Sequence, residues 1–220
     1  MGEPAEPSIS RVQRRKQRTR AALIGAAQKF IAEGRLSVPV LDITQAADVG
    51  MGSFYNHFDS KEDLFAAAVA DALDAHGALL DVLTSDIEDP AETFACRFRL
   101  TGRLFRRRPE ESQILLANGV ALMTSDRGLA PRALRDIEAA VSAGRFVVED
   151  PQLALVVAGG AIMGLGALLS NDPGRDDARA ADSVTADVLR LFGMSADDAA
   201  EVCSRPLPDL DAITPPHSAA

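Results

Sequence analysis

The stretch Met51-Gly-Ser-Phe-Tyr-Asn-His-Phe-Asp-Ser-Lys-Glu-Asp-Leu-Phe65 says most about how this chain of 220 residues folds. Phe54 and Phe58 are four residues apart, so on a helix both side chains lie on one face. The other face of that helix is polar, with Ser53, Asn56 and His57. The pattern predicts a short helix over residues 52–58 that is anchored by its apolar face and offers its polar face to a partner.

The segment before this stretch predicts two more helices. Apolar residues recur at spacings of three and four between Thr19 and Glu33, which is typical of an amphipathic helix, and Gly34 is suited to end it. Proline is tolerated at the first position of a helix, so Pro39 can open a second helix that runs to about Asp48. Two short helices joined by a glycine-containing turn form a helix-turn-helix, whose second helix enters the major groove of DNA.

The rest of the chain has the pattern of an all-α protein. Ser60 can cap a helix that has acids in its first turn, and we expect this helix to run to about Val82. Alanine and leucine, the strongest helix formers, are abundant, and alternating β-branched runs are nearly absent. Prolines punctuate the remaining pattern. Further helices are expected near residues 91–107, 109–125, 129–143, 151–170, 176–192 and 195–203.

Charge is distributed unevenly along the chain, whose formal net charge is −9. Residues 11–61 hold nine Lys/Arg and four Asp/Glu, a balance of +5, whereas residues 62–220 hold fourteen Lys/Arg and twenty-six Asp/Glu, a balance of −12. This asymmetry indicates a head that binds a polyanion and an acidic body that repels one. The densest basic stretch, Arg11 to Arg20, is either a solvated arm or a set of phosphate contacts, which depend on charge density.

Composition argues against several classes of protein. The two cysteines, Cys96 and Cys203, do not suit a disulfide scaffold, and the three scattered histidines form no zinc motif. The first ten residues lack the apolar run of a signal peptide. The longest apolar run, Leu153 to Leu169, contains four glycines and is short for a membrane span of about 20 residues. We expect a soluble cytoplasmic protein without a metal or other cofactor.

A series of short motifs spans residues 18–65. In order these are a helix ending in Ala-Ala-Gln-Lys-Phe30, then Asp42-Ile43, Ala47-Asp48-Val49, Gly52 to Phe58, and Ser60 to Leu64. Their order and spacing resemble the TetR family of bacterial one-component regulators. Beyond residue 65 the chain resembles the family in length and helical pattern. The resemblance implies an all-α fold with an N-terminal three-helix DNA-binding head, and a larger helical body for ligand binding and dimerisation.

By position, the resemblance also implies roles for individual residues. Four of them lie toward the bases of DNA: Met51, Gly52, Ser53 and Asn56. Others lie toward phosphates: Tyr55, His57 and Lys61, together with Arg14, Arg15, Lys16 and Arg18 of the basic stretch. Phe54 and Phe58 are packing residues. The assignment of Tyr55 agrees with its chemistry, because a tyrosine hydroxyl can donate to a phosphate from a packed ring.

Some positions keep a second interpretation or depart from the family pattern. Met51 is either a turn residue or an apolar contact to a thymine methyl group, and His57 is either a phosphate contact or a structural residue. Thr44 stands where the family usually has alanine, and Val38-Pro39 stands where it usually has a polar cap. Both departures bear on where the second helix starts and how it is tilted.

The segment Leu153–Leu169 is apolar around most of its circumference, so one domain surface does not cover all of it. Gly160 and Gly164, four residues apart, allow a second helix to approach closely. With the helix near 176–192, this segment predicts a four-helix interface between two copies of the chain; an internal core helix is the alternative. The predicted interface residues are Leu155, Gly160, Met163, Gly164, Ala167, Val184, Val188 and Leu191.

The resemblance implies a ligand pocket within the helices of residues 60–143. Its predicted lining residues are Phe65, Phe94, Arg97, Phe98, Phe105, Leu115, Asn118, Leu122 and Met123. Ordinary core packing is the alternative for the aromatic residues. Asn118 is polar among apolar neighbours, and a buried amide needs a partner, which a ligand can supply. Arg97 and Arg103 are candidates for holding an acidic ligand.

These observations divide the chain into a basic flexible arm (1–17), a helix-turn-helix domain (18–59), a regulatory and dimerisation domain (60–205) and a flexible tail (206–220). The predicted function is sequence-specific DNA binding by a homodimeric transcriptional regulator, a repressor that an unknown small molecule releases from a palindromic operator. Alternatives are an all-helical enzyme and a membrane-surface protein. No catalytic motif appears for the first, and the helix at 19–33 has little basic charge for the second.

Overall fold

The computed structural model describes residues 10–123 and 128–210, without the side chains of residues 120–123. The described residues form ten α-helices and no strand, which confirms the all-α prediction. The chain divides into two compact units, residues 1–69 and 70–220. The division falls within α4 (Lys61–Leu83), ten residues beyond the boundary expected from the sequence. The first turns of α4 belong to the first unit because Leu64 and Ala68 are completely buried there.

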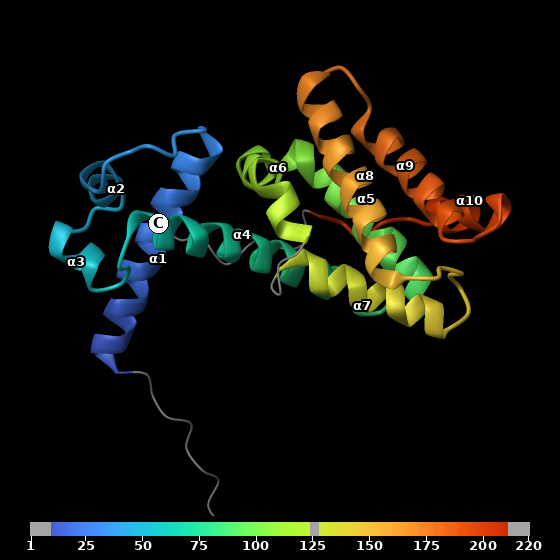
Figure 1. The fold of residues 1–220 in the computed structure, drawn as a ribbon, viewed down its shortest axis with the longest axis horizontal. Coiled ribbons are helices and arrows are strands. Elements are labelled where there is room, and N and C mark those ends of the chain that lie inside the picture. The colour runs from blue at the N-terminus through green and yellow to red at the C-terminus, as the bar shows by residue number, and fades with distance from the viewer. Residues whose placement is uncertain (1–9, 124–127, 211–220) are drawn as a thin grey trace, which may run out of the picture. The chain divides into compact units, whose positions relative to one another are not determined.

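The first unit contains α1 (Arg11–Ala32), α2 (Val40–Ala46), α3 (Met51–Tyr55) and the start of α4 (Figure 1). Gly34 follows α1 with a φ of 70°, a left-handed conformation that glycine adopts without strain. The amide of Asp63 donates to Ser60 Oγ at 3.0 Å, so Ser60 caps α4 as predicted. The largest buried side chains are those of Leu23, Ile24, Phe30, Ile31, Ile43, Phe54, Phe58 and Leu64.

Helix α1 begins at Arg11, eight residues earlier than the sequence pattern predicted. Residues 11–17, expected as a flexible arm, are therefore helical, while residues 1–9 lie outside the described residues. The start is fixed by a capping box: Ser10 Oγ accepts from the amide of Gln13, and Gln13 Oε1 accepts from the amide of Ser10. Apolar periodicity missed this part of the helix because its side chains do not contribute to the core.

The second unit is built around α5 (Pro90–Arg107), which contacts every helix that follows it. Eleven of its residues are buried. The surrounding helices are α6 (Pro109–Met123), α7 (Leu129–Ser142), α8 (Pro151–Asn171), α9 (Asp177–Leu191) and α10 (Ala196–Ser204). Figure 1 shows α8 and α9 side by side, and the two helices are in contact. Rings of Phe94, Phe146 and Phe192 pack together, with centroids 5.3–5.6 Å apart.

The sequence had suggested that residues 206–210 belong to a flexible tail. In the structure they are packed. Leu210 is 8% exposed and lies in a cluster with Leu79, Leu80 and Leu100, and Leu207 packs against the same cluster. Apolar burial outweighs the extended tendency of the prolines here. Residues 211–220 of the expected tail lie outside the described residues.

Helices α5 and α9 approach closely at Gly102. A Cβ atom on Gly102 would lie 2.6 Å from the Cβ of Ala181 and 3.2 Å from Cδ2 of Leu165. We expect Gly102→Ala to lower the free energy of unfolding by about 1–3 kcal/mol, because the clash with a short side chain exceeds the gain in helix propensity. Thermal unfolding of both variants checks this. Gly25→Ala is the control, since a Cβ on Gly25 meets nothing within 4 Å. An unchanged Tm for Gly102→Ala would contradict the expectation.

Candidate nucleic-acid interface and buried cavity

Helix α3 is held in the first unit by two phenylalanine side chains. Phe54 is completely buried, Phe58 is 6% exposed, and their ring centroids are 6.1 Å apart. The residues predicted to face bases lie on the accessible side, where Met51, Gly52 and Asn56 are exposed and Ser53 is half-buried. The predicted arrangement of a buried apolar face and an accessible polar face is confirmed.

Two of the residues predicted to face phosphates flank this surface. Tyr55 is 61% exposed, and its ring stands edge-on to Phe54 with the centroids 5.1 Å apart. The packed ring restricts where the hydroxyl can point. Lys61 is the first residue of α4 and is half-buried. Both side chains come from segments whose backbone is fixed by neighbouring packing.

Helix α2 supports α3 and accommodates the two departures from the family pattern. It begins at Val40, and its N-cap Pro39 makes no side-chain hydrogen bond to the helix. Thr44 is 1% exposed, and its hydroxyl donates to the carbonyl of Leu41 at 2.9 Å. Threonine therefore fits in place of a smaller apolar residue without leaving a buried hydroxyl unsatisfied.

The N-terminal half of α1 presents a concentrated positive charge. Arg14, Arg15, Lys16 and Arg18, predicted to face phosphates, are all exposed. The sequence of α1 contains no acidic residue. Basic side chains in the first turns of a helix oppose its dipole, which favours anions at that end. This charge does not stabilise the isolated helix, so it is suited to an anionic partner.

A groove lies between this part of α1 and the end of the helix-turn-helix. It is lined by Gln13, Lys16, Gln17, Arg20 and His57. The guanidinium of Arg20 sits 5.3 Å from the centre of the Phe58 ring. Partial burial, followed by the charges of Lys16 and Arg20, lowers the pKa of His57 below its ordinary value. Sequence reasoning placed Arg20 at the end of the basic stretch, as a solvated residue or a phosphate contact, and did not connect it with His57. The capping box Ser10-x-x-Gln13 was the available signal that Gln13, Lys16 and Gln17 belong to the same helix.

The second unit contains an apolar cavity of about 120 Å³ among α5, α6, α7 and α8, with Leu80 of α4 also in its lining. Four of the residues predicted to line a pocket do so: Phe94, Arg97, Phe98 and Leu115. Leu155, Ile162 and Met163 of α8 complete much of the apolar wall. Met163, predicted as an interface residue, therefore also belongs to the cavity. The shape and lining suit a small, largely apolar molecule.

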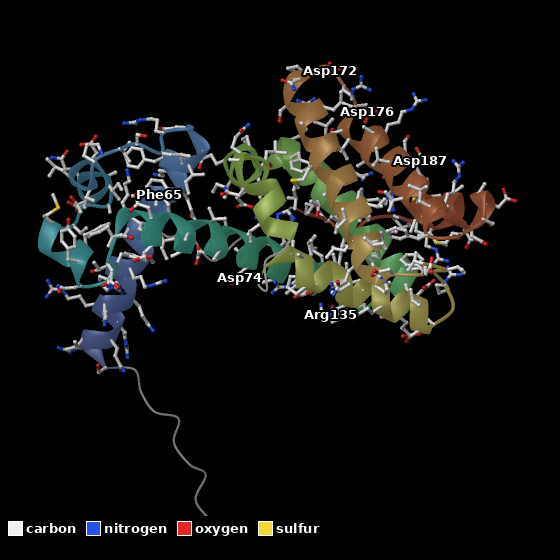
Figure 2. The ribbon with its side chains drawn as sticks, in the orientation of Figure 1. Phe65, Asp74, Arg135, Asp172, Asp176 and Asp187 are labelled. Atoms are coloured by element: carbon white, nitrogen blue, oxygen red, sulfur yellow. The ribbon has the colours of Figure 1, made fainter. Side chains whose placement is uncertain are left out.

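The polar end of the cavity is a network of charged side chains. Arg97 contacts Asp136 on α7 and Asp81 on α4, each at 2.9 Å, and donates through Nε to Thr84 at 2.9 Å. Arg132 on α7 also contacts Asp81, at 2.9 Å. Figure 2 labels Asp74 on α4 and Arg135 on α7, which extend the network. Arg97, Thr101, Arg132 and Asp136 line the cavity itself.

Several predicted pocket residues lie elsewhere. Phe65 belongs to the first unit, and Phe105 packs with Leu165, Leu169 and Ala181 in a separate core cluster. Asn118 does not line the cavity, and its amide already has a partner, since it donates to the carbonyl of Ile114 one turn earlier. The side chains of Leu122 and Met123 lie outside those described. The two arginines proposed to hold an acidic ligand are already paired, Arg97 as above and Arg103 with Asp182 at 2.9 Å.

Sequence reasoning missed Thr101, Arg132 and Asp136. Asp136 follows its partner Arg97 by 39 residues, so no local spacing links the two. One signal was available: Asp136 and Ile137 fall on the buried face of a helix, and a carboxylate at such a position requires a partner.

Helix α8 has an apolar face that the second unit leaves open. Leu153 is 64%, Val156 53% and Val157 43% exposed, and Cβ atoms on Gly160 or Gly164 would meet nothing within 4 Å. By length and composition α8 is apolar enough to cross a membrane, although Ala154, Ala158, Leu165 and Leu169 pack against other helices. Of the other predicted interface residues, Ala167 and Leu191 are exposed and Leu155 and Val184 are half-buried.

Val188 was wrongly predicted as an interface residue. It is 2% exposed and belongs to the main hydrophobic cluster of the second unit. The apolar stripe of α9 faces α5, which leaves mainly polar residues on the outer side of α9. Most apolar residues on α9 thus supply the core, whereas α8 has apolar residues both in the core and on the open face.

Comparisons with known proteins agree with this geometry. Residues 23–68 match the model of bacterial regulatory proteins of the tetR family, and residues 89–205 match a tetracyclin repressor-like C-terminal domain. The transcriptional regulator TtgR of Pseudomonas putida is 30% identical over 98 residues. That match spans 44% of this chain and 46% of TtgR.

Solved structures match over a greater length. The chain is 32% identical to RolR, covering 98% of that protein both with resorcinol bound (89% of this chain, TM-score 0.61) and without ligand (86%, TM-score 0.67). A regulator structure from Shewanella sp. PV-4, 13% identical, shares the fold over 80% of this chain with a TM-score of 0.68. The chain belongs to the TetR family of helix-turn-helix transcriptional regulators.

Proposed function

We propose that the protein is a cytoplasmic, homodimeric repressor that binds a palindromic operator and leaves it when a small molecule occupies the cavity of the second unit. The observation that carries this is the orientation of α3, with Phe54 and Phe58 buried and the opposite side accessible. On such a surface, Met51, Gly52, Ser53 and Asn56 would contact base edges. Tyr55, His57, Lys61 and the basic residues of α1 would contact phosphates.

The dimer is proposed to form through the open face of α8. Apolar residues at spacings of three and four run along it, and its two glycines let a partner helix come close. A folded protein rarely leaves a continuous apolar face in water. A symmetric pair of chains carries two copies of α3 related by a two-fold axis, which is the reason to expect a palindrome.

The effector is proposed to be a small aromatic molecule. RolR, 32% identical over almost its whole length, has been crystallised with resorcinol. The cavity of about 120 Å³ is comparable to the apolar cavity of roughly 150 Å³ that holds benzene in an engineered protein. Phe94 and Phe98 supply aromatic walls.

Helix α4 is the proposed route from the cavity to the head. Its first turns pack in the first unit, whereas Asp74 and Asp81 hold Arg97 and Arg132 in the second. A ligand at the polar end of the cavity would change these ion pairs and therefore the contacts that fix α4 in the second unit. Release requires that the ligand bind the DNA-competent and DNA-incompetent states unequally.

The separate roles proposed for the base-facing and phosphate-facing residues of the first unit can be tested by substitution. We expect Tyr55→Phe and Lys61→Ala to weaken binding to all duplexes about tenfold, because each removes a phosphate contact. Asn56→Ala and Ser53→Ala should instead change which sequences are preferred. Selection of duplexes from a random library, followed by fluorescence anisotropy, measures both. Glu138→Ala, on the exposed side of α7, is the control. Equal affinity and preference for all variants would refute the assignment.

Binding should depend on pH through His57. Its pKa is lowered in the free protein, and a phosphate in the groove stabilises the imidazolium, so DNA binding takes up a proton. Affinity should therefore rise as pH falls from about 8 to about 6. Lys16 and Arg20 are the basic residues that line the groove with His57. His57→Gln should flatten the dependence measured by anisotropy; an equal slope in both proteins would count against the phosphate contact.

The dimer can be tested on the open face of α8. We expect the protein to be dimeric at micromolar concentration and Val156→Glu to be monomeric, because the new carboxylate would be buried without a partner. Val156 is 53% exposed in the single chain, so the substitution should leave its fold intact. Ala139→Glu, at an exposed site on α7, is the matched control. Size-exclusion chromatography with light scattering gives the masses, and a monomeric parent protein would overturn the proposal.

A further inference from the structure

Among the described residues, the charges at the polar end of the cavity balance. Arg97, Arg132 and Arg135 lie within 4 Å of Asp74, Asp81 or Asp136, which pairs three described cations with three described anions. The neighbouring His76, 3% exposed, is neutral near pH 7 because burial lowers its pKa to about 4. An anionic ligand would meet no surplus positive charge from these described side chains, and it would have to be buried beside the carboxylate of Asp136.

The two uncharged or negative polar groups that line the cavity offer lone pairs. The carboxylate of Asp136 accepts from Nη1 of Arg97, at 3.1 and 2.9 Å, and a carboxylate has about four acceptor sites. The hydroxyl of Thr101 donates to the carbonyl of Arg97 at 2.9 Å, so its only hydrogen is used. His76 Nε2 lies 3.2 Å from Thr101 Oγ1. With the hydroxyl hydrogen of Thr101 directed to the carbonyl of Arg97, the tautomer of His76 that carries its hydrogen on Nε2 completes this contact. Asp136 and Thr101 therefore act toward a ligand as acceptors.

We propose that this cavity selects a neutral aromatic ring carrying a hydroxyl group that donates its hydrogen to Asp136. The proposal rests on the function proposed above and specifies the chemistry of its effector. A hydroxyl can also accept from a guanidinium N–H, which suits a site where a carboxylate and an arginine lie side by side. The ring occupies the apolar part between Phe94, Phe98 and Leu115.

Three ring compounds separate the alternatives. Resorcinol carries hydroxyl groups, 1,3-difluorobenzene carries substituents at the same positions that cannot donate, and benzoate carries a negative charge. Binding to the DNA-free protein is measured by isothermal titration calorimetry at pH 7. We expect resorcinol to bind at least about tenfold more tightly than either of the others, because a hydrogen bond to a buried carboxylate contributes that much. Hydrophobicity alone would favour the fluorinated ring.

Asp136→Asn tests the named acceptor. The parent protein should prefer resorcinol over 1,3-difluorobenzene, and this preference, taken as the ratio of the two dissociation constants, should be at least about fivefold smaller in the variant. The carboxylate is lost, while Arg97 keeps its contact with Asp81. The ratio is measured within one protein, so a general loss of stability does not produce it. Should the variant fail to fold, the preference of the parent protein among the three compounds still decides the matter.

The outcomes distinguish this inference from the function on which it rests. If 1,3-difluorobenzene or benzoate bound as tightly as resorcinol or more tightly, the proposed requirement for a donating hydroxyl group would be overturned. The cavity would remain the proposed effector site. If none of the three compounds bound, both the requirement for a hydroxyl group and the proposal of an aromatic effector would be overturned. Neither result would touch the DNA-binding role of α3, which is measured separately by anisotropy.

Discussion

Burial of Phe54 and Phe58 determines which side of α3 points outward, and the DNA-binding role depends on that orientation. A helix of five residues is not stable by itself, because the hydrogen bonds of one turn do not offset the entropy lost when the helix is nucleated. Each buried phenylalanine contributes about 1.5–3 kcal/mol, so packing rather than helix propensity holds the segment. The polar residues of α3 are then presented at fixed positions without needing strong interactions of their own. Helices α1, α2 and the start of α4 form the rest of the unit in which the two rings are buried.

Most of the fold could be predicted from the sequence, because proline, glycine and capping serine mark where helices end and apolar periodicity marks their buried sides. Errors arose where those signals are silent. The first half of α1 has no apolar stripe, so only the Ser10–Gln13 capping pattern indicates it. Residues 206–210 look extended by composition, yet two leucines among the prolines find a hydrophobic cluster made by distant helices. Such contacts depend on tertiary structure and leave no local pattern.

The two candidate sites differed in how far the sequence could predict them. The surface of α3 is one contiguous segment, and residue spacing correctly separated its anchoring side from its accessible side. The cavity is assembled from five helices, and its polar end joins residues that are distant in sequence, such as Arg97 and Asp136, which are 39 residues apart. Apolar residues could be assigned to the interior, but not to the cavity wall as opposed to the solid core. Phe105 and Phe98 look alike in sequence and ended in different clusters.

Helix α8 has two roles on opposite sides. Leu155, Ile162 and Met163 form part of the cavity wall, while Val156, Gly160 and Gly164 lie on the open apolar face. We expect a change of residue size on either side to shift the helix axis and so to affect the other side. Sequence variation is then expected to be most restricted along α8, and relatives with a different effector should differ mainly in α5, α6 or α7. Divergence among relatives with different chemical inputs is expected to concentrate on those three helices.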